Sequence, residues 1–212
     1  MANIFVSKSR IVPFLALHEG SPSCDRGARE RISRSIERHQ GNIDVLVHPG
    51  FFTVDNEGAG NASWFLLQKA VEDPLSGYNL YRARVKKTLS GSERPLFIFH
   101  DRTKSGGIYG WALGTARADN IVIVETQDSK PLPYMGKDEG PGDQDWDLFR
   151  TDLIGLGVKT SRVFGEYLHN DGELFFGCVN TAYKSLHHSV MKAGIYECLT
   201  YPYGVYQGCS ER

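Results

Sequence analysis

Short continuous apolar runs alternate along the chain with longer segments whose apolar residues recur every three or four positions. The first kind predicts buried strands and the second predicts helices. The predicted strands cover 43–52, 94–101, 120–127, 161–168 and 195–202. The predicted helices cover 61–73, 76–91, 145–158 and 178–194. Continuous apolar strands interleaved with helices are typical of an α/β fold, so we expect a three-layer α/β/α sandwich with a mainly parallel sheet.

The first 40 residues interrupt this alternation. We therefore expect an N-terminal extension over 1–40 and a single α/β domain over 41–212. Within the extension, 24–41 predicts a helix with Ile32 and Ile36 on one face. The segment 106–116 fits either a short crossover helix or a strand, and 128–144 predicts a long surface loop.

Composition limits the possible binding partners more than it limits the possible fold. The chain has 212 residues, 41% of them hydrophobic and 23% charged, with a net charge of −1. This charge argues against a nucleic-acid binder that relies on bulk charge and against a polybasic membrane surface. No apolar run approaches the length of a membrane-spanning helix, and we find no persuasive signal peptide, so we expect a cytoplasmic protein.

The four cysteines are Cys24, Cys178, Cys198 and Cys209. None of them forms a CxxC pair, so the spacing of a zinc site is missing. Reduced thiols are the simplest interpretation for a cytosolic chain of this size. We expect no metal and no cofactor, and the His187–His188 pair does not change this, because it has no partner at helical spacing.

In an open α/β sheet, ligands bind beyond the carboxyl ends of the strands. Many titratable side chains follow the predicted strands there. They are His48, His100, Asp101, Arg102, Lys104, Glu125, Asp128, Glu166 and His169. Only the predicted topology brings these residues together.

Cys178 begins a predicted helix directly after a short apolar run and Gly177. At a helix N-terminus the macrodipole and the free N–H groups favour a thiolate and lower the pKa of the thiol. The N–H groups of Val179 and Asn180 can also stabilise an oxyanion. The alternative is that Cys178 packs in the core as a small hydrophobic residue.

The other candidates have equally plain alternatives. His48 follows an apolar strand and His100 lies at the end of one. Each is either a base or a structural histidine that is hydrogen-bonded to a carbonyl. Glu166 is a proton acceptor, a ligand for a substrate amine, or a capping or ion-paired residue. The loop 100–107 contains Lys104 and Ser105 beside two glycines. This pattern is a weak signal for a phosphate-binding loop, and a simple turn also explains it.

The second half of the chain resembles the isochorismatase-like (cysteine hydrolase) family over about 50 residues. The matching positions are Phe149, Thr151, Leu153, Gly157, Val158, Gly165, Cys178, Val179, Thr181 and Ala182. The resemblance implies a six-stranded, mainly parallel sheet between helices and cleavage of small amides or ethers through an Asp-Lys-Cys triad. In this triad Cys178 is the cysteine and Lys137 occupies the region of the lysine. His48, in "VHPG", stands where the family has its aspartate.

These observations lead to one preferred function and two alternatives. The preferred function is a small-molecule hydrolase acting on a C–N bond, in which Cys178 attacks a carbonyl carbon. His48 or Glu166 then transfers the proton and Lys137 assists electrostatically. The first alternative is a non-catalytic ligand-binding or regulatory protein, and the second is a phosphate or nucleotide binder that uses 103–107. The expected partner is a small molecule, and the tyrosine-rich segment 196–206 suits a homo-oligomer interface.

Overall fold

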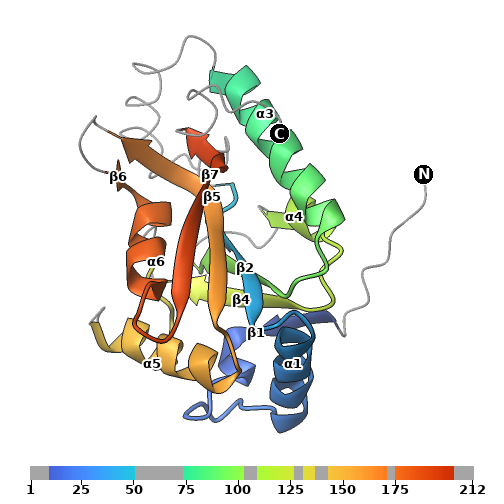
Figure 1. Cartoon of the computed structure of the whole chain (residues 1–212), viewed down its shortest axis with the longest axis vertical. Helices are drawn as coiled ribbons and strands as arrows, with labels where there is room; N and C mark the ends of the chain where they lie inside the picture. Colours follow the sequence, from blue (N-terminus) through green and yellow to red (C-terminus); the bar gives the residue numbers. More distant parts are fainter. Residues whose placement is uncertain are drawn as a thin grey trace.

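A parallel sheet runs through the centre of the molecule (Figure 1). The computed structural model describes residues 10–50, 74–102, 109–126, 131–136, 143–170 and 175–202. The strands are β1 (Ile11–Pro13), β2 (Asn42–Val47), β3 (Leu96–Asp101), β4 (Ile121–Thr126), β5 (Thr160–Asn170), β6 (Phe175–Phe176) and β7 (Lys192–Pro202). Their order is β1-β4-β3-β2-β5, with β7 on the far side of β5. These neighbours are all parallel, which confirms the expected α/β fold; among the described strands, only β6 pairs antiparallel, with the end of β5.

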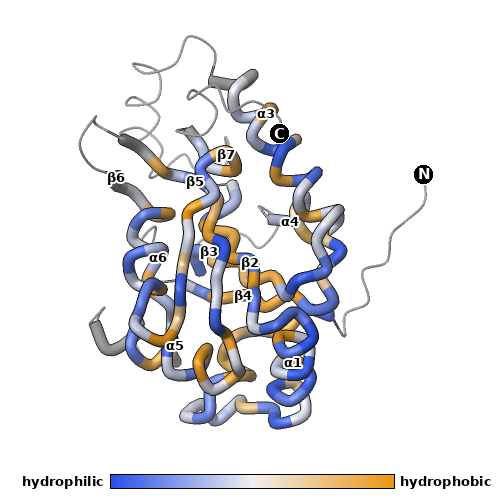
Figure 2. The backbone as a smooth tube through the Cα atoms, in the orientation of Figure 1, coloured by the Kyte–Doolittle hydropathy of each residue, from blue (hydrophilic) through white to orange (hydrophobic). Residues whose placement is uncertain are grey.

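Helices cover both faces of the sheet and form two separate hydrophobic cores. The helices are α1 (Arg26–Arg38), α3 (Pro74–Gly91), α4 (Gly110–Leu113), α5 (Asp143–Gly155) and α6 (Cys178–Leu186), and a short 3₁₀ helix, η2, covers Phe14–Ala16. One core joins the sheet to α1, α5 and α6, and the other joins it to α3 and α4. The tube in Figure 2 shows hydrophobic residues concentrated along the central strands, with hydrophilic residues frequent on the helices.

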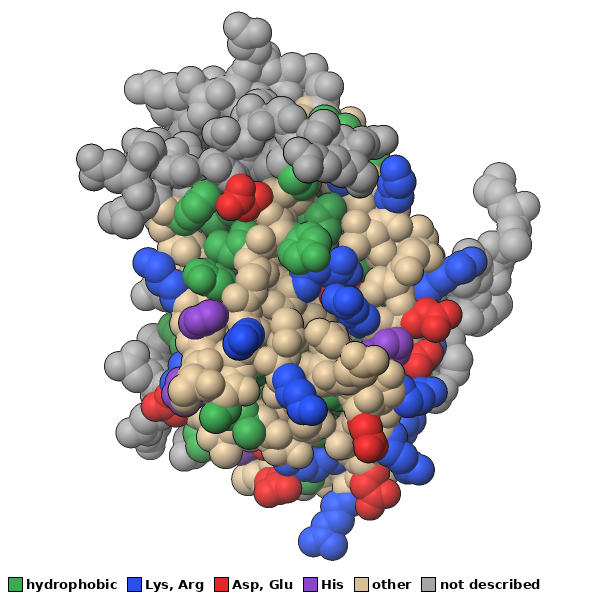
Figure 3. All heavy atoms as spheres, in the orientation of Figure 1, with side chains coloured by type: hydrophobic (Ala, Val, Ile, Leu, Met, Phe, Trp, Pro, Cys, Tyr) green, Lys and Arg blue, Asp and Glu red, His purple; other side chains and the backbone are tan. Residues whose placement is uncertain are grey.

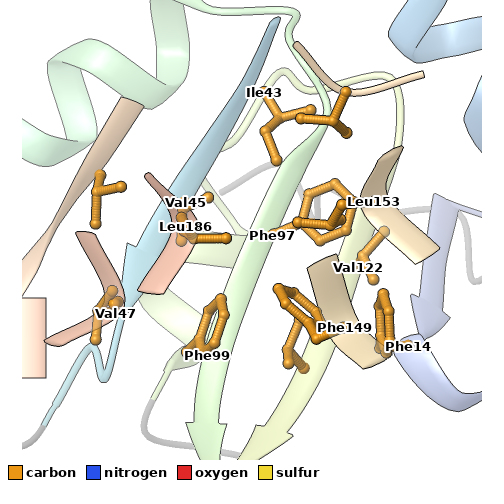
Figure 4. Packing of buried hydrophobic residues seen from close by; sticks show 14 of the residues in the cluster. Phe14, Ile43, Val45, Val47, Phe97, Phe99, Val122, Phe149, Leu153 and Leu186 are labelled. Atoms are coloured by element: carbon orange, nitrogen blue, oxygen red, sulfur yellow. The ribbon is translucent and has the colours of Figure 1, made fainter. Parts of the chain in front are cut away.

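The strands are apolar on both faces because both faces are covered. In β3, Phe97 and Phe99 belong to one core, whereas Leu96 and Ile98 belong to the other. Figure 4 shows Phe97 and Phe99 beside Phe149 of α5. Successive side chains of a strand point to opposite faces, so a strand buried on both sides is a continuous apolar run. This burial explains why the apolar pattern predicted these strands.

Residues of the expected N-terminal extension are part of the same sheet and core. β1 pairs with β4 through Ile11↔Ile121 and the two following positions. In α1, Ile32 and Ile36 are fully buried against the sheet. Asp25 caps this helix by accepting a hydrogen bond from the Ala28 N–H group at 3.1 Å, which satisfies one of the unpaired donors of the first turn.

The helix expected over 178–194 is wrong in its second half. α6 ends at Leu186, and β7 already begins at Lys192, which pairs with Thr160 of β5. A turn between them is closed by reciprocal backbone hydrogen bonds between His188 and Met191. Pairing with β5 therefore overrides the helical pattern, because tertiary contacts outweigh small differences in helix propensity.

The two other predicted elements are a short helix or strand over 106–116 and a helix over 61–73. The ambiguous segment 106–116 contains the short helix α4, as one of its two interpretations predicted. The helix expected over 61–73 lies outside the described residues.

The cysteines differ from one another. Cys24 and Cys178 are free, whereas Cys198 is disulfide-bonded, so the expectation of a reduced thiol is wrong for Cys198. Among the helices that the structure describes, none has the length and apolar character needed to cross a bilayer.

Charged side chains of both signs are interspersed on the face of the molecule shown in Figure 3. Two exposed arginines of α1 lie close to carboxylates on this surface. Arg34 lies 3.8 Å from Glu30 on the same helix, and Arg38 lies 2.9 Å from Asp119. Exposed pairs of this kind contribute little to stability, so we regard this surface as a solvated, mixed-charge face.

Candidate functional site

Buried polar side chains gather where the parallel strands end. They come from every long strand of the sheet and are at most 9% exposed. They are His48 after β2, His100 and Asp101 at the end of β3, Thr126 at the end of β4, Glu166 in β5 and Thr200 in β7. Buried ionisable groups are costly unless they are paired or functional, so this carboxyl edge is the candidate functional site.

Cys178 lies at this edge as the first residue of α6 and is buried. The preceding Gly177 has φ 101°, a conformation that favours glycine, and a Cβ there would overlap the carbonyl oxygen of Tyr167. The chain can therefore approach β5 this closely only with glycine at position 177. Asn180 adds a hydrogen bond from its side-chain amide to the Phe175 carbonyl at 2.5 Å, so the start of α6 is fixed against β5 and β6.

The pKa of Cys178 is raised, which is opposite to the expected effect of a helix N-terminus. Burial is the main cause and brings the pKa to about 12. A hydrogen bond from the backbone lowers the pKa, but the negative charges of Glu166 and Asp101 raise it further. Desolvation disfavours a buried thiolate more than the helix N-terminus favours it, so Cys178 rests as a thiol at neutral pH.

Asp101 is the residue that sequence reasoning noted but did not select. It follows Phe97 and Phe99 at two-residue spacing, and these lie in the same core as Cys178, so it belongs to the Cys178 face of the sheet. Its charge acts on the thiol of Cys178 and on the imidazole of His48. In the sequence, the signal for Asp101 is the carboxylate that ends the apolar run "LFIFHD". The sequence does not give the order of the strands, and it is this order that places β3 directly beside β2.

His48 lies across the end of β3. Its backbone N–H donates to the Phe99 carbonyl at 3.0 Å, and its Nε2 lies 3.0 Å from Thr126 Oγ1 of β4. Its φ of 46° is unusual for a residue other than glycine, as is the φ of 65° at Tyr167 in β5. Such conformations cost free energy and persist only where the surrounding structure imposes them, often at functional sites.

The imidazole of His48 is neutral. Burial lowers its pKa to about 4; Asp101 opposes this shift and His100 adds to it. A neutral imidazole with so low a pKa is a poor general base at neutral pH. The hydrogen bond to Thr126 therefore holds the His48 imidazole in place, and the imidazole is uncharged at neutral pH.

Acid should destabilise the protein through His48. Its pKa in the folded state, about 4, is below the usual value of 6.5, so the unfolded chain binds the proton more readily. The stabilisation is complete above pH 6.5 and is lost as the pH falls towards 4, by about 3 kcal/mol. We expect His48→Asn, which tolerates positive φ, to reduce the fall in unfolding free energy between pH 7 and pH 4, measured by urea titration. An unchanged pH dependence would contradict the neutral, buried imidazole.

Glu166 is fully buried and bonds to Tyr78 of α3, which belongs to the core on the α3 side of the sheet. Its carboxylate accepts a hydrogen bond from the Gly50 N–H at 2.6 Å and another from the Tyr78 hydroxyl at 3.0 Å. These donors hold the carboxylate and connect β5 to the residues after β2 and to α3. The negative charge of Glu166 nevertheless reaches the thiol of Cys178.

Two further expected residues, Lys137 and Lys104, lie outside the described residues. On the rim of the edge, the Arg102 guanidinium lies over the Tyr134 ring at 4.1 Å, and the rings of His100 and Tyr109 are in contact. Within the described part of the chain, no group of three or more His, Cys, Asp or Glu side chains is arranged to hold a metal ion.

The site thus combines a buried thiol at a helix start, two carboxylates whose charges reach it, and a neutral imidazole. A thiol and a carboxylate on one face of a sheet edge can perform nucleophilic attack coupled to proton transfer. Comparison of the chain with models of protein families, with curated proteins and with solved structures gave no match.

Proposed function

We propose that the protein is a small-molecule hydrolase that cleaves a C–N bond of the amide type. One observation carries this proposal: Cys178, at the start of α6, and Asp101, at the end of β3, share one face of the carboxyl edge, and the charge of Asp101 reaches the thiol. The resemblance to isochorismatase-like hydrolases supports the same chemistry. Asp101 takes the role that the resemblance assigns to an aspartate on the first strand.

The reaction begins from the protonated thiol. The Cys178 sulfur attacks the carbonyl carbon while its proton passes to the Asp101 carboxylate, and the backbone N–H groups at the start of α6 stabilise the oxyanion. Collapse of the tetrahedral intermediate breaks the C–N bond, and the leaving amine takes the proton from Asp101. Water then hydrolyses the thioester and restores the thiol. A thiol with a raised pKa suits this sequence, because the sulfur attacks in the same step in which it loses its proton.

Cys178→Ala should abolish turnover, and Asp101→Asn should lower kcat by about 10²- to 10⁴-fold, the range typical of a lost general base. The measurement is the release of ammonia or amine from a panel of small amides and ureas. Cys24→Ala, which removes the other described free thiol, is the control and should retain full activity. Full turnover by Cys178→Ala would refute the hydrolase.

A second candidate is a non-catalytic ligand-binding protein. The pKa of about 12 at Cys178 favours it, because such a thiol reacts slowly near neutral pH. In that case small amides stabilise the protein against heat without being consumed, and Cys178→Ala binds them as well as the unaltered chain does.

A further inference from the structure

Cys198 of β7 is exposed and disulfide-bonded, whereas Cys24 and Cys178 are free thiols. The chain has four cysteines, so within one chain the partner of Cys198 is Cys209, which lies outside the described residues. The proposed hydrolysis uses Cys178 and assigns no role to this bond. An exposed disulfide is open to attack by thiolates from solution, and disulfides of this kind are readily reduced and often regulatory.

The pairing of β7 with β5 is irregular at the position of the disulfide. It stops at Ile195 and resumes at Thr200, so residues 196–199 of β7 face a single residue of β5. Cys198 lies in this bulge, and within it the Thr200 hydroxyl donates to the Glu197 carbonyl at 2.6 Å. A bulge disrupts the hydrogen-bond ladder and bends the strand. This stretch of β7 is therefore held less by β5 than the rest of the strand is.

The strand enters the core directly after the bulge. Leu199 and Tyr201 are buried in the core on the α3 side of the sheet. The Tyr201 ring meets the ring of Tyr78 of α3 edge-on, with 5.3 Å between their centroids. Tyr78 in turn donates a hydrogen bond to Glu166. The conformation of the bulge therefore influences how β7 packs against α3.

We propose that Cys198 and Cys209 form a redox-sensitive disulfide, whose oxidised form holds the end of β7 against α3. A dithiol reductant or two molecules of glutathione supply two electrons and two protons, which break the S–S bond and leave two thiols. Glutathione disulfide accepts the electrons and protons and restores the bond through a mixed disulfide. In the reduced form only noncovalent contacts hold the bulge, so β7 and the helix packed on it become less stable. This inference does not depend on the proposed hydrolysis.

Peptide mass spectrometry tests the pairing. Lys192 and Arg212 are consecutive sites for trypsin, so both cysteines lie in one peptide, 193–212. The protein is equilibrated with glutathione disulfide, treated with iodoacetamide and digested without reductant. We expect this peptide to be unalkylated and lighter by two hydrogen atoms than its dithiol form, while Cys24 is alkylated in the same sample. Alkylation of both cysteines of the peptide, or a disulfide to a second chain, would overturn the proposal.

Thermal unfolding and hydrogen exchange test the effect on the fold. Mixtures of reduced and oxidised glutathione set the fraction of the disulfide, and the full chain is studied at each ratio. We expect complete reduction to lower Tm by at least about 5 °C, in line with the loss of a typical disulfide in a chain of this size. Amide exchange in α3 should become faster in the reduced protein. An unchanged Tm, unchanged exchange in α3, or a bond that glutathione cannot reduce would each contradict the redox-sensitive disulfide.

Two matched variants show that the response belongs to this bond. Cys198→Ser should have the Tm of the reduced protein at every glutathione ratio, because it cannot form the disulfide. Cys24→Ser removes a free thiol and should keep the full response of the unaltered chain. A Cys198→Ser protein that still responds to glutathione would refute the assignment. If this variant fails to fold, reduction of the unaltered chain still gives the result. No measurement in this set depends on turnover, so failure of the hydrolase leaves the test intact.

Discussion

Gly165→Ala is expected to destabilise the fold by about 3–5 kcal/mol, because an added methyl group meets backbone that cannot move aside. Gly165 pairs with Val47 of β2 and has φ 136°. A Cβ at this position would overlap the carbonyl oxygen of Val47 and would lie 2.6 Å from its nitrogen. Relief requires β2 and β5 to separate just below His48 and Glu166.

Gly194→Ala is the matched control for this change. Gly194 lies in β7, the other neighbour of β5, and a Cβ there meets nothing within 4 Å. Alanine at this position should be neutral or slightly stabilising, because it lowers the entropy of the unfolded chain. Urea unfolding of the two variants measures the difference, and similar stabilities would contradict the close approach of β2 and β5.

Asp44→Ala is expected to cost about 3–5 kcal/mol, the range for breaking a buried ion pair from one side. Asp44 of β2 is 1% exposed and binds Arg162 of β5 through two hydrogen bonds, of 2.9 and 2.5 Å. The Ser92 hydroxyl donates a third, of 2.9 Å. Removing the carboxylate leaves the Arg162 guanidinium without this partner while it still lies against the rings of Phe164 and Tyr196.

Two comparisons separate this effect from a general loss of charge. Glu30→Ala removes the partner of Arg34 from a pair in which both side chains are 74% exposed, and it should change the unfolding free energy by no more than about 0.5 kcal/mol. Asp44→Leu combined with Arg162→Met should recover most of the stability, since hydrophobic replacement of a whole buried pair is often neutral. Chemical denaturation gives all these values. A loss from Asp44→Ala no larger than that from Glu30→Ala would contradict a buried, desolvated pair.

The sequence predicted the fold best where local pattern and tertiary burial agree. β2, β3 and β4 are apolar on both faces, so their runs were recognisable without knowledge of their neighbours. The prediction was wrong for the second half of the 178–194 helix, because Lys192 pairs with Thr160, which is 32 positions earlier in the chain. β1 has three residues and is too short to give a periodic signal, so only its pairing with β4 reveals it.

The features of the candidate site also divide into those that the sequence alone predicts and those that depend on the tertiary structure. The sequence by itself determined that Cys178 begins a helix, that Asp101 ends an apolar strand and that Glu166 is in another, because short-range patterns define the ends of such elements. Only the tertiary structure decided that β3 lies beside β2, and therefore that the charge of Asp101 reaches both Cys178 and His48. It also decided that the pKa of Cys178 is raised. Desolvation and distant charges come from residues far away in the chain, and the local helix N-terminus cannot outweigh them.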